Sequence, residues 1–288
     1  MSGDIFRTKN IVWNVTANIA HNSTKILKLP ETKTKLNGGF RESDSGSNSS
    51  LWYEEGQPLY NIMLPEFAGL DENGQALYWQ DTDLLYTDDN GKLTMSTTKP
   101  GKQRNEKTTD WNMASYYAQG TTLPDVTGGF STMLKVYDFD LSATFDFQIG
   151  GSLYDNRYMS LMTNVATSGN GQTYHKDVLD SWSVENTGSC IPRWQYGDQF
   201  TAARSTRFLT NASYLNFQSF TVGYTIPKRL TSKIYLSKVR IYCQGENIYF
   251  WSKRKGLDPR YSFAGTNSGG VNAYSPVRTI MGGIQVSF

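Results

Sequence analysis

A group of side chains in the second half of the sequence has the residue types needed for acid–base chemistry. His175 is followed by Asp177, Asp180 and Glu185, which bring one imidazole and several carboxylates into a short segment. Glycosidases use two carboxylates that flank the bond to be cleaved. The alternative is a solvated loop, and we favour it. No Gly-x-Ser-x-Gly elbow and no Cys–His arrangement stands out, so we expect the chain not to be an enzyme.

A second acidic group lies earlier in the chain and has the oxygen-rich character of a calcium site. It consists of Asp81, Asp83, Asp88 and Asp89, followed by Asn90-Gly91. Calcium takes several oxygen ligands, but these residues lack the spacing of a twelve-residue calcium loop. Asp-Asn-Gly is first of all a turn sequence. We therefore expect neither a metal nor a cofactor.

Aromatic residues in the long connections form the third candidate group. A ring offers a large apolar face, often with a polar handle, and so suits sugar or peptide ligands. The candidates for ligand binding are Trp52, Trp79, Trp111, Trp182, Trp194 and Tyr196. The alternative is that these rings pack the loops against each other, because such long loops need a core of their own.

Composition excludes several classes of protein. The chain has 288 residues and a formal net charge of +2, which argues against nucleic-acid binding. Its two cysteines, Cys190 and Cys243, exclude a disulfide scaffold, and we expect them to be unpaired. No run of about 18 apolar residues is present, which excludes a transmembrane helix. The abundance of Tyr and Gly favours β-structure.

The elements that must position these groups are strands. Residues 139–149 alternate strictly between apolar and polar side chains, and residues 11–19 follow the same period of two. Such alternation places all the apolar side chains on one face of a strand. The same period is present at 220–226, 239–243 and 280–288, and shorter, weaker strands are predicted at 25–29 and 130–136. The sequence therefore predicts about seven strands, with a short helix only near residues 154–162.

Short and long connections alternate between these predicted strands. The short ones are residues 21–24, Asp138 and residues 227–236, and the long ones are 30–127, 151–210 and 252–275. In an antiparallel meander, all short connections then lie at one end of the sheet and all long ones at the other. Outer-membrane β-barrels show this asymmetry. A soluble β-sandwich has the same alternation of polarity, and periodicity alone leaves both folds open.

Several sequence blocks resemble the SusC/RagA family of TonB-dependent outer-membrane transporters. The similar blocks are LPDVTGGF at 123–130, SYLNF at 213–217, GYTIP at 223–227, GENIY at 245–249, KGLDP at 255–259 and YSPVRT at 274–279. Each block is short, and their joint order and spacing carry the resemblance. The likeness covers most of the chain and is strong from about Pro124 onward.

The resemblance implies an all-β fold, namely a partial, antiparallel, up-and-down transmembrane β-barrel with long extracellular loops. It implies location in the outer membrane of a Gram-negative bacterium and import of oligosaccharides or oligopeptides. The implied partners are a SusD-like lipoprotein that caps the loops, the TonB complex and outer-membrane lipid. Ile284, Val286 and Phe288 match the alternating, aromatic-ended signature read by the barrel-assembly machinery. The alternative is that Phe288 is simply the last lipid-facing side chain.

The sequence also departs from the family's pattern. Members begin with a signal peptide, a TonB-interacting segment and a plug domain, and nothing in this sequence resembles those parts. About seven strands are too few for a plugged transporter barrel of roughly 22 strands. We therefore expect residues 1–288 to be the C-terminal part of a receptor barrel, without signal peptide, TonB box or plug, and unable to transport alone. The alternative function is a soluble extracellular β-sandwich that binds glycans or acts as an adhesin.

Overall fold

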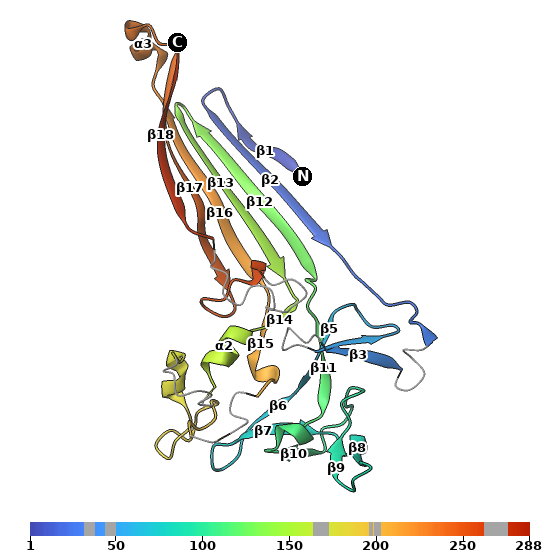
Figure 1. Cartoon of the computed structure of the whole chain (residues 1–288). Coiled ribbons are helices and arrows are strands. Elements are labelled where there is room, and N and C mark those ends of the chain that lie inside the picture. Colours follow the sequence, from blue (N-terminus) through green and yellow to red (C-terminus); the bar gives the residue numbers. More distant parts are fainter. Residues whose placement is uncertain (32–37, 44–49, 164–172, 196–197, 199–202, 262–275) are drawn as a thin grey trace.

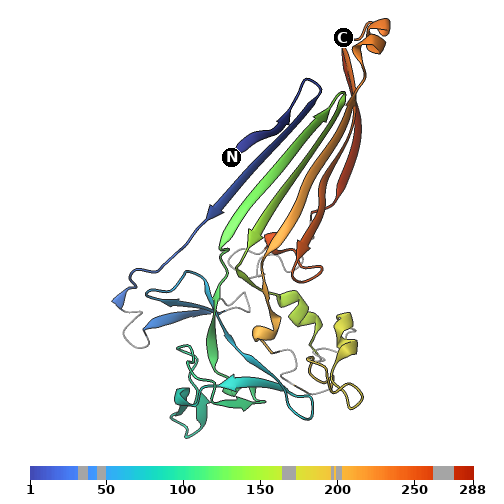
Figure 2. The same ribbon diagram turned by 180° about the vertical axis from the view of Figure 1, so that it is seen from behind.

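The chain folds into a long sheet with a smaller assembly of short strands and helices at one end (Figure 1). The computed structural model describes residues 1–31, 38–43, 50–163, 173–195, 198, 203–261 and 276–288. The view from behind shows the long strands running side by side, away from the smaller assembly (Figure 2). No described helix has the length and apolar character needed to cross a membrane.

The long sheet is a seven-stranded antiparallel meander. Its strands, in spatial order, are β1 (Ser2–Arg7), β2 (Ile11–His21), β12 (Val126–Val136), β13 (Phe139–Ile149), β16 (Tyr214–Thr225), β17 (Lys238–Ser252) and β18 (Thr279–Ser287). Each strand pairs with the long strand before it in the sequence. Among the described residues, the outer edges of β1 and β18 are unpaired, as expected for part of a larger sheet.

The connections divide the sheet into a tight end and a loop end, as predicted. At the tight end, β1 joins β2 through residues 8–10, and β12 joins β13 through residues 137–138. The third tight-end connection contains the short helices α3 (Lys228–Thr231) and η5 (Ser232–Ile234). All three long connections emerge at the loop end. The alternation inferred from connection lengths is therefore confirmed.

One predicted strand is wrong, and another was missed. Residues 25–29 form no strand, because Ile26 is buried in the loop assembly and its backbone pairs with Gly56 and Gln57. The additional strand of the sheet is instead β1. A register shift between Asp4 and Phe6 interrupts its pairing with β2, so its sequence lacks a clean two-residue period. The first short connection of the sheet is therefore residues 8–10, between β1 and β2. The expected short link at residues 21–24 is instead the start of a long connection.

The loop assembly has regular structure of its own. Its strands are β3 (Gly39–Ser43), β4 (Ser50–Glu54), β5 (Asn61–Pro65), β6 (Phe67–Leu70), β7 (Ala76–Gln80), β8 (Leu85–Thr87), β9 (Leu93–Met95), β10 (Glu106–Thr108), β11 (Tyr116–Thr121), β14 (Ser152–Tyr154) and β15 (Leu209–Asn211). Its helices are α2 (Asn156–Leu161) and the 3-10 turns η1 (Thr82–Leu84), η2 (Trp111–Met113), η3 (Lys176–Asp180), η4 (Thr206–Phe208) and η6 (Pro259–Tyr261). The expected short helix is α2, whose first turn is capped by Asp155.

The buried core lies in the loop assembly and not in the long sheet. One cluster joins two long connections by packing Ile62 and Leu64 of β5 against Tyr154, Met162 and Phe208. Of the buried apolar side chains in the described part of the chain, Val239 alone belongs to the long sheet. The long connections therefore pack together as a folded unit that sits on the end of the sheet.

Candidate functional site

The long sheet places most of its apolar side chains on one face. The register places Leu134 opposite Leu141, Leu141 opposite Val222, and Ile241 opposite Ile284. Because each strand alternates, these pairs all lie on the same side of the sheet. We call this side the apolar face.

A row of stacked rings crosses the middle of the apolar face. The ring centroids of Phe130 and Phe145 are 4.8 Å apart, and those of Phe145 and Phe217 are 4.6 Å apart. A second aromatic pair, Phe139 and Tyr224, lies nearer the tight end, and its ring centroids are 4.5 Å apart. Cross-strand aromatic pairs of this kind stabilise a sheet and fix its register.

Among the described residues, no second sheet covers the apolar face. Phe139 is 57% exposed, Ile149 is 54% exposed and Ile284 is 67% exposed. In a sandwich, these side chains would be buried between two layers. The sandwich alternative is therefore wrong for the described chain. An uncovered apolar surface of this extent marks an interaction with another apolar medium or protein.

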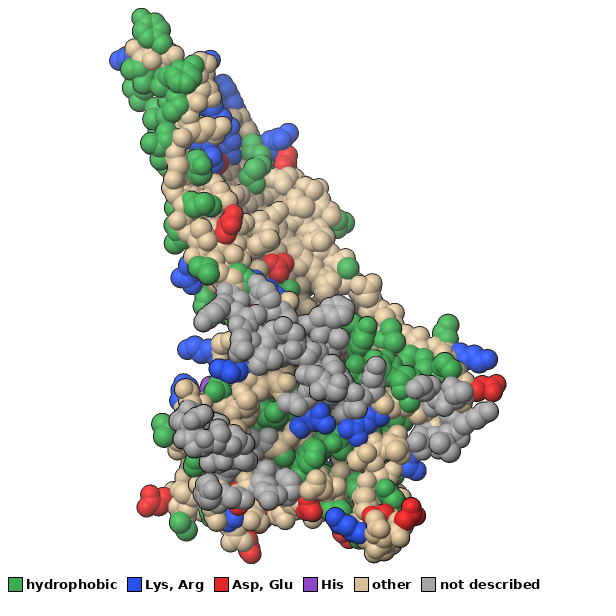
Figure 3. Space-filling model, in the orientation of Figure 1, with side chains coloured by type: hydrophobic (Ala, Val, Ile, Leu, Met, Phe, Trp, Pro, Cys, Tyr) green, Lys and Arg blue, Asp and Glu red, His purple; other side chains and the backbone are tan. Residues whose placement is uncertain are grey.

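The opposite face of the sheet is polar, and we call it the polar face. Arg240 of β17 pairs with Asp140 of β13 across the intervening strand β16, with Nε 3.0 Å from Oδ1. The strand between them carries Gly223 at the crossing point, where an added Cβ would lie 2.6 Å from the Asp140 carboxylate. Asn216 donates to Asp146 at 2.6 Å on the same face. In Figure 3, polar and backbone atoms cover most of the visible face of the sheet.

A cavity of about 580 Å³ lies in the loop assembly beside α2. Its wall contains His175, Asp177, Tyr158 and Arg254. The Tyr158 hydroxyl donates to Asp177 at 2.8 Å, and the Arg254 guanidinium carbon lies 4.1 Å from the centre of the Tyr158 ring. His175 Nδ1 is 3.2 Å from Asp177. The cavity therefore brings together one of the predicted carboxylates and the predicted histidine.

Burial is the main cause of the raised pKa of Tyr158 in this cavity. It raises the pKa of Tyr158 to about 12, and the hydrogen bond to the Asp177 carboxylate adds to the effect. A carboxylate that accepts from the phenol opposes its ionisation, because a second negative charge would face the first. Tyr158 is therefore a hydrogen-bond donor at physiological pH.

The other predicted acid–base residues lie outside this cavity. Asp180 and Glu185 are exposed, and the backbone carbonyl of Asp180 accepts from Ser189 Oγ at 2.6 Å. The second carboxylate on the cavity wall is Asp155, which caps α2 and lies 3.5 Å from Arg254. Asp155 and Asp177 thus each interact with a neighbouring side chain, Arg254 and Tyr158 respectively. These contacts agree with a structural role for this segment.

The acidic group near residue 81 is used for local structure. Asp81 accepts from three backbone N–H groups, those of Asp83, Lys102 and Gln103. Burial raises the pKa of Asp81, but these hydrogen bonds outweigh burial, so its pKa lies below the usual range. Asp88 accepts from the backbone of Asn90 and forms the expected turn. Within the described residues, no group of His, Cys, Asp and Glu is arranged to hold a metal.

Three of the predicted ligand-binding aromatics contact other segments of the loop assembly. Trp52 is 1% exposed in the loop core, so its ring is closed to ligands in this conformation. Trp111 donates its ring N–H to the Arg204 carbonyl at 2.7 Å. Trp182 covers Gly74, where an added Cβ would lie 2.8 Å from the indole Cγ. These contacts join segments that are distant in the sequence.

The other predicted aromatics differ in their surroundings. Trp79 is half-buried, with the Lys107 ammonium 4.7 Å from its ring centre. Trp194 packs edge-to-face on Tyr174 at 4.9 Å. Tyr196 lies outside the described residues. Ligand binding by Trp79, Trp111, Trp182 and Trp194 stays a prediction.

The structure adds charged residues that the sequence patterns did not indicate. Arg254 and Lys255 line the cavity beside α2, and Lys255, Arg260 and Arg278 line a second cavity at the end of β17. The available signal was the Lys-Arg-Lys run at 253–255, at the start of the predicted long connection 252–275. Cys190 and Cys243 are both free thiols, as predicted.

Comparison with known proteins identifies the relatives of the chain. No protein-family profile matches the sequence. TonB-dependent receptors P3 and P26 of Formosa agariphila are 23% and 25% identical to it, and the alignments cover 97% and 98% of the chain. TonB-dependent receptor SusC of Bacteroides thetaiotaomicron is 23% identical over 98% of the chain.

The chain is homologous to TonB-dependent receptors. It spans 27% of the length of receptor P3 and 25% of SusC. The structure of the RagAB peptide transporter superposes on the whole chain with a TM-score of 0.70 and 24% identity, and the match covers 28% of the transporter chain. The resemblance inferred from the sequence blocks is thereby confirmed, and the long sheet has the fold of a segment of that transporter's barrel.

The two faces of the sheet predict effects of different size for a substitution by arginine. Phe145→Arg places a cation on the apolar face near the middle of β13, and we expect it to destabilise the receptor in a bilayer by about 2–4 kcal/mol. Thr144→Arg, the matched control, projects from the polar face and should cost much less. Urea titration in phospholipid vesicles, followed by tryptophan fluorescence, measures both. Equal destabilisation would contradict the assignment of the faces.

The titration of Tyr158 predicts a loss of stability at high pH. Its folded-state pKa of about 12 lies above the usual value of about 10, so its contribution is complete below pH 10 and is lost as the pH rises toward 12. We expect Tyr158→Phe to reduce the loss of unfolding free energy between pH 9 and pH 11, measured by urea unfolding. Tyr86→Phe, at a 51% exposed position, is the control. An identical loss in Tyr158→Phe and the parent protein would show that this phenol does not contribute.

Proposed function

We propose that this chain forms part of the barrel wall and extracellular loops of a TonB-dependent nutrient importer in the outer membrane of a Gram-negative bacterium. The observation that carries the proposal is the uncovered apolar face of the long sheet. In hydrocarbon, backbone polar groups must be paired internally, and apolar side chains must face outward. A meander with an apolar outer face and a polar inner face meets both requirements once its edges are closed.

The unpaired edges support the assignment of the chain to one part of a larger barrel. β1 and β18 each have a partner on one side within the described chain. Open edges in lipid are unfavourable, so further strands must complete the wall. We propose that residues 1–288 correspond to the C-terminal part of the receptor barrel. The plug and the TonB-interacting segment would then belong to the parts of the relatives that this chain does not match.

The implied cargo is an oligosaccharide or an oligopeptide, delivered with a SusD-like lipoprotein. RagAB is described as a peptide transporter, which supports the peptide alternative. The relationship to SusC supports partnership with a SusD-like protein. The loop assembly, with its own buried core, would provide the outer surface on which such a lipoprotein docks.

We also propose that Ile284, Val286 and Phe288 act as the signal for barrel assembly. All three are exposed, and Phe288 is 94% exposed just beyond the end of β18. The alternation puts Ile284 and Val286 on the apolar face, where an assembly factor can contact them before lipid does.

Deletion of the gene for the intact receptor tests this proposal. We expect the receptor to fractionate with outer membranes, and the deletion strain to lose uptake of labelled oligopeptides or of labelled oligosaccharides. Re-expression should restore the uptake, and a proton uncoupler should abolish it again because TonB-driven transport needs the proton gradient. Recovery of the protein as a soluble secreted species, or uptake unchanged by deletion for both classes of cargo, would contradict the proposal.

A further inference from the structure

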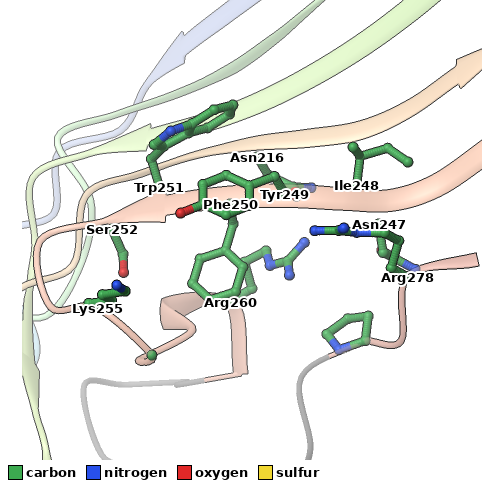
Figure 4. A pocket seen from close by; sticks show the side chains of 12 residues that line it. Asn216, Asn247, Ile248, Tyr249, Phe250, Trp251, Ser252, Lys255, Arg260 and Arg278 are labelled. Carbon is green, nitrogen blue, oxygen red and sulfur yellow. The ribbon is translucent and has the colours of Figure 1, made fainter.

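A cavity of about 580 Å³ opens at the loop end of β17 (Figure 4). One side is formed by the last part of β17, including Asn247 and Phe250, and the other by the connection that follows, including Lys255, Arg260 and Arg278. Phe250 pairs in register with Asn216 of β16, which bonds to Asp146 on the polar face. The cavity therefore lies on the same side of the sheet as the polar face, and we call it the β17 cavity.

The charged side chains that line the β17 cavity are all cations within the described part of the chain. They are Lys255, Arg260 and Arg278. Arg260 is held by Asp258 through two hydrogen bonds of 2.8 and 2.6 Å, and its guanidinium lies 5.3 Å from the centre of the Phe250 ring. Arg260 and Phe250 thus form a fixed wall whose charge is largely offset by Asp258.

The remaining two cations give the cavity its positive charge. Lys255 and Arg278 are exposed, and neither forms an ion pair with another described residue. They come from the two ends of the connection between β17 and β18, so the cavity collects charge from segments that are separated in the sequence. Cations that line a partly enclosed cavity attract anions more strongly than the same cations on an open surface.

The backbone of β17 is distorted where it borders the cavity. Asn247 has a φ of 52°, in the left-handed region, and the pairing of β16 with β17 shifts register between Phe217 and Ser219. Such bulges redirect side chains and are common beside functional sites. Here the bulge brings Asn247 to the cavity wall, where its amide nitrogen lies 3.4 Å from the Val277 carbonyl (Figure 4).

We propose that the β17 cavity binds a carboxylate group of the imported substrate. Lys255 and Arg278 supply the charge, Asn247 supplies a neutral donor at the bulge, and the Phe250–Arg260 wall contacts the adjoining part of the substrate. This inference rests on the proposed importer function and narrows its cargo to carboxylate-bearing oligomers. The carboxylate is either the C-terminus of an oligopeptide or a uronate of an acidic oligosaccharide.

Binding by the intact purified receptor tests the inference with matched ligand pairs. The peptide pair is hexa-alanine with a free C-terminus and its C-terminal amide, and the sugar pair is tetragalacturonate and its methyl ester. We expect the receptor to prefer the charged member of one pair by about tenfold at low salt, and added salt to reduce this preference. The pair that shows the preference identifies the source of the carboxylate.

Variants assign the preference to the cavity. Lys255→Gln combined with Arg278→Gln should abolish the preference by lowering the affinity for the charged ligand to that for the uncharged one. Lys253→Gln, an exposed cation outside the cavity lining, is the matched control and should retain the preference. Melting temperatures of all variants establish that they are folded.

Three outcomes would overturn the inference. Equal binding of the charged and uncharged members of both pairs would show that the receptor does not recognise a carboxylate. Retention of the preference in the double variant would place recognition elsewhere. Absence of binding for all four ligands would also overturn it. Uptake of neutral oligomers that is lost on gene deletion would, in any of these cases, leave the importer function standing.

Discussion

Successive side chains of a β-strand point to opposite faces, so a sheet keeps one face apolar only if every strand holds its register. This constraint governs the long sheet. A slip of one residue in β13 would move Phe145 out of the aromatic row and bring its polar neighbours to the apolar face. The stacked rings of Phe130, Phe145 and Phe217 on one side, and the Asp140–Arg240 pair over Gly223 on the other, both require the observed pairing.

The loop assembly depends on a different kind of stabilisation. Its segments pack around buried side chains such as Ile62 and Phe208, as in a soluble domain. The chain therefore combines a sheet whose apolar surface is turned outward with loops whose apolar surface is turned inward. The cavities lie in the loop assembly and at the end of the sheet, where the polar face and the connections meet and where a ligand can reach fixed charges.

The sequence predicted the sheet better than the loops, for a physical reason. Alternation is a local property, so residues 139–149 revealed β13, and connection lengths revealed which end carries the loops. The strand predicted at residues 25–29 is wrong because the backbone of Ile26 forms hydrogen bonds with Gly56 and Gln57. No local sequence pattern encodes this contact. Burial of Trp52 likewise depends on partners elsewhere in the chain. The grouping of Lys255 with Arg278 in one cavity joins residues 23 positions apart in the sequence, which no local pattern encodes.

The most direct test of the account is the environment of neighbouring residues on one strand. Val222 and Thr221 of β16 lie on the apolar and polar faces respectively, so each is replaced by cysteine in a receptor whose own cysteines are serine and is labelled with a fluorophore. In phospholipid vesicles, nitroxide-bearing lipids should quench the label at 222, and aqueous iodide should quench the label at 221. The opposite pattern, or equal quenching at both positions, would contradict a sheet with one lipid-facing side and one aqueous side.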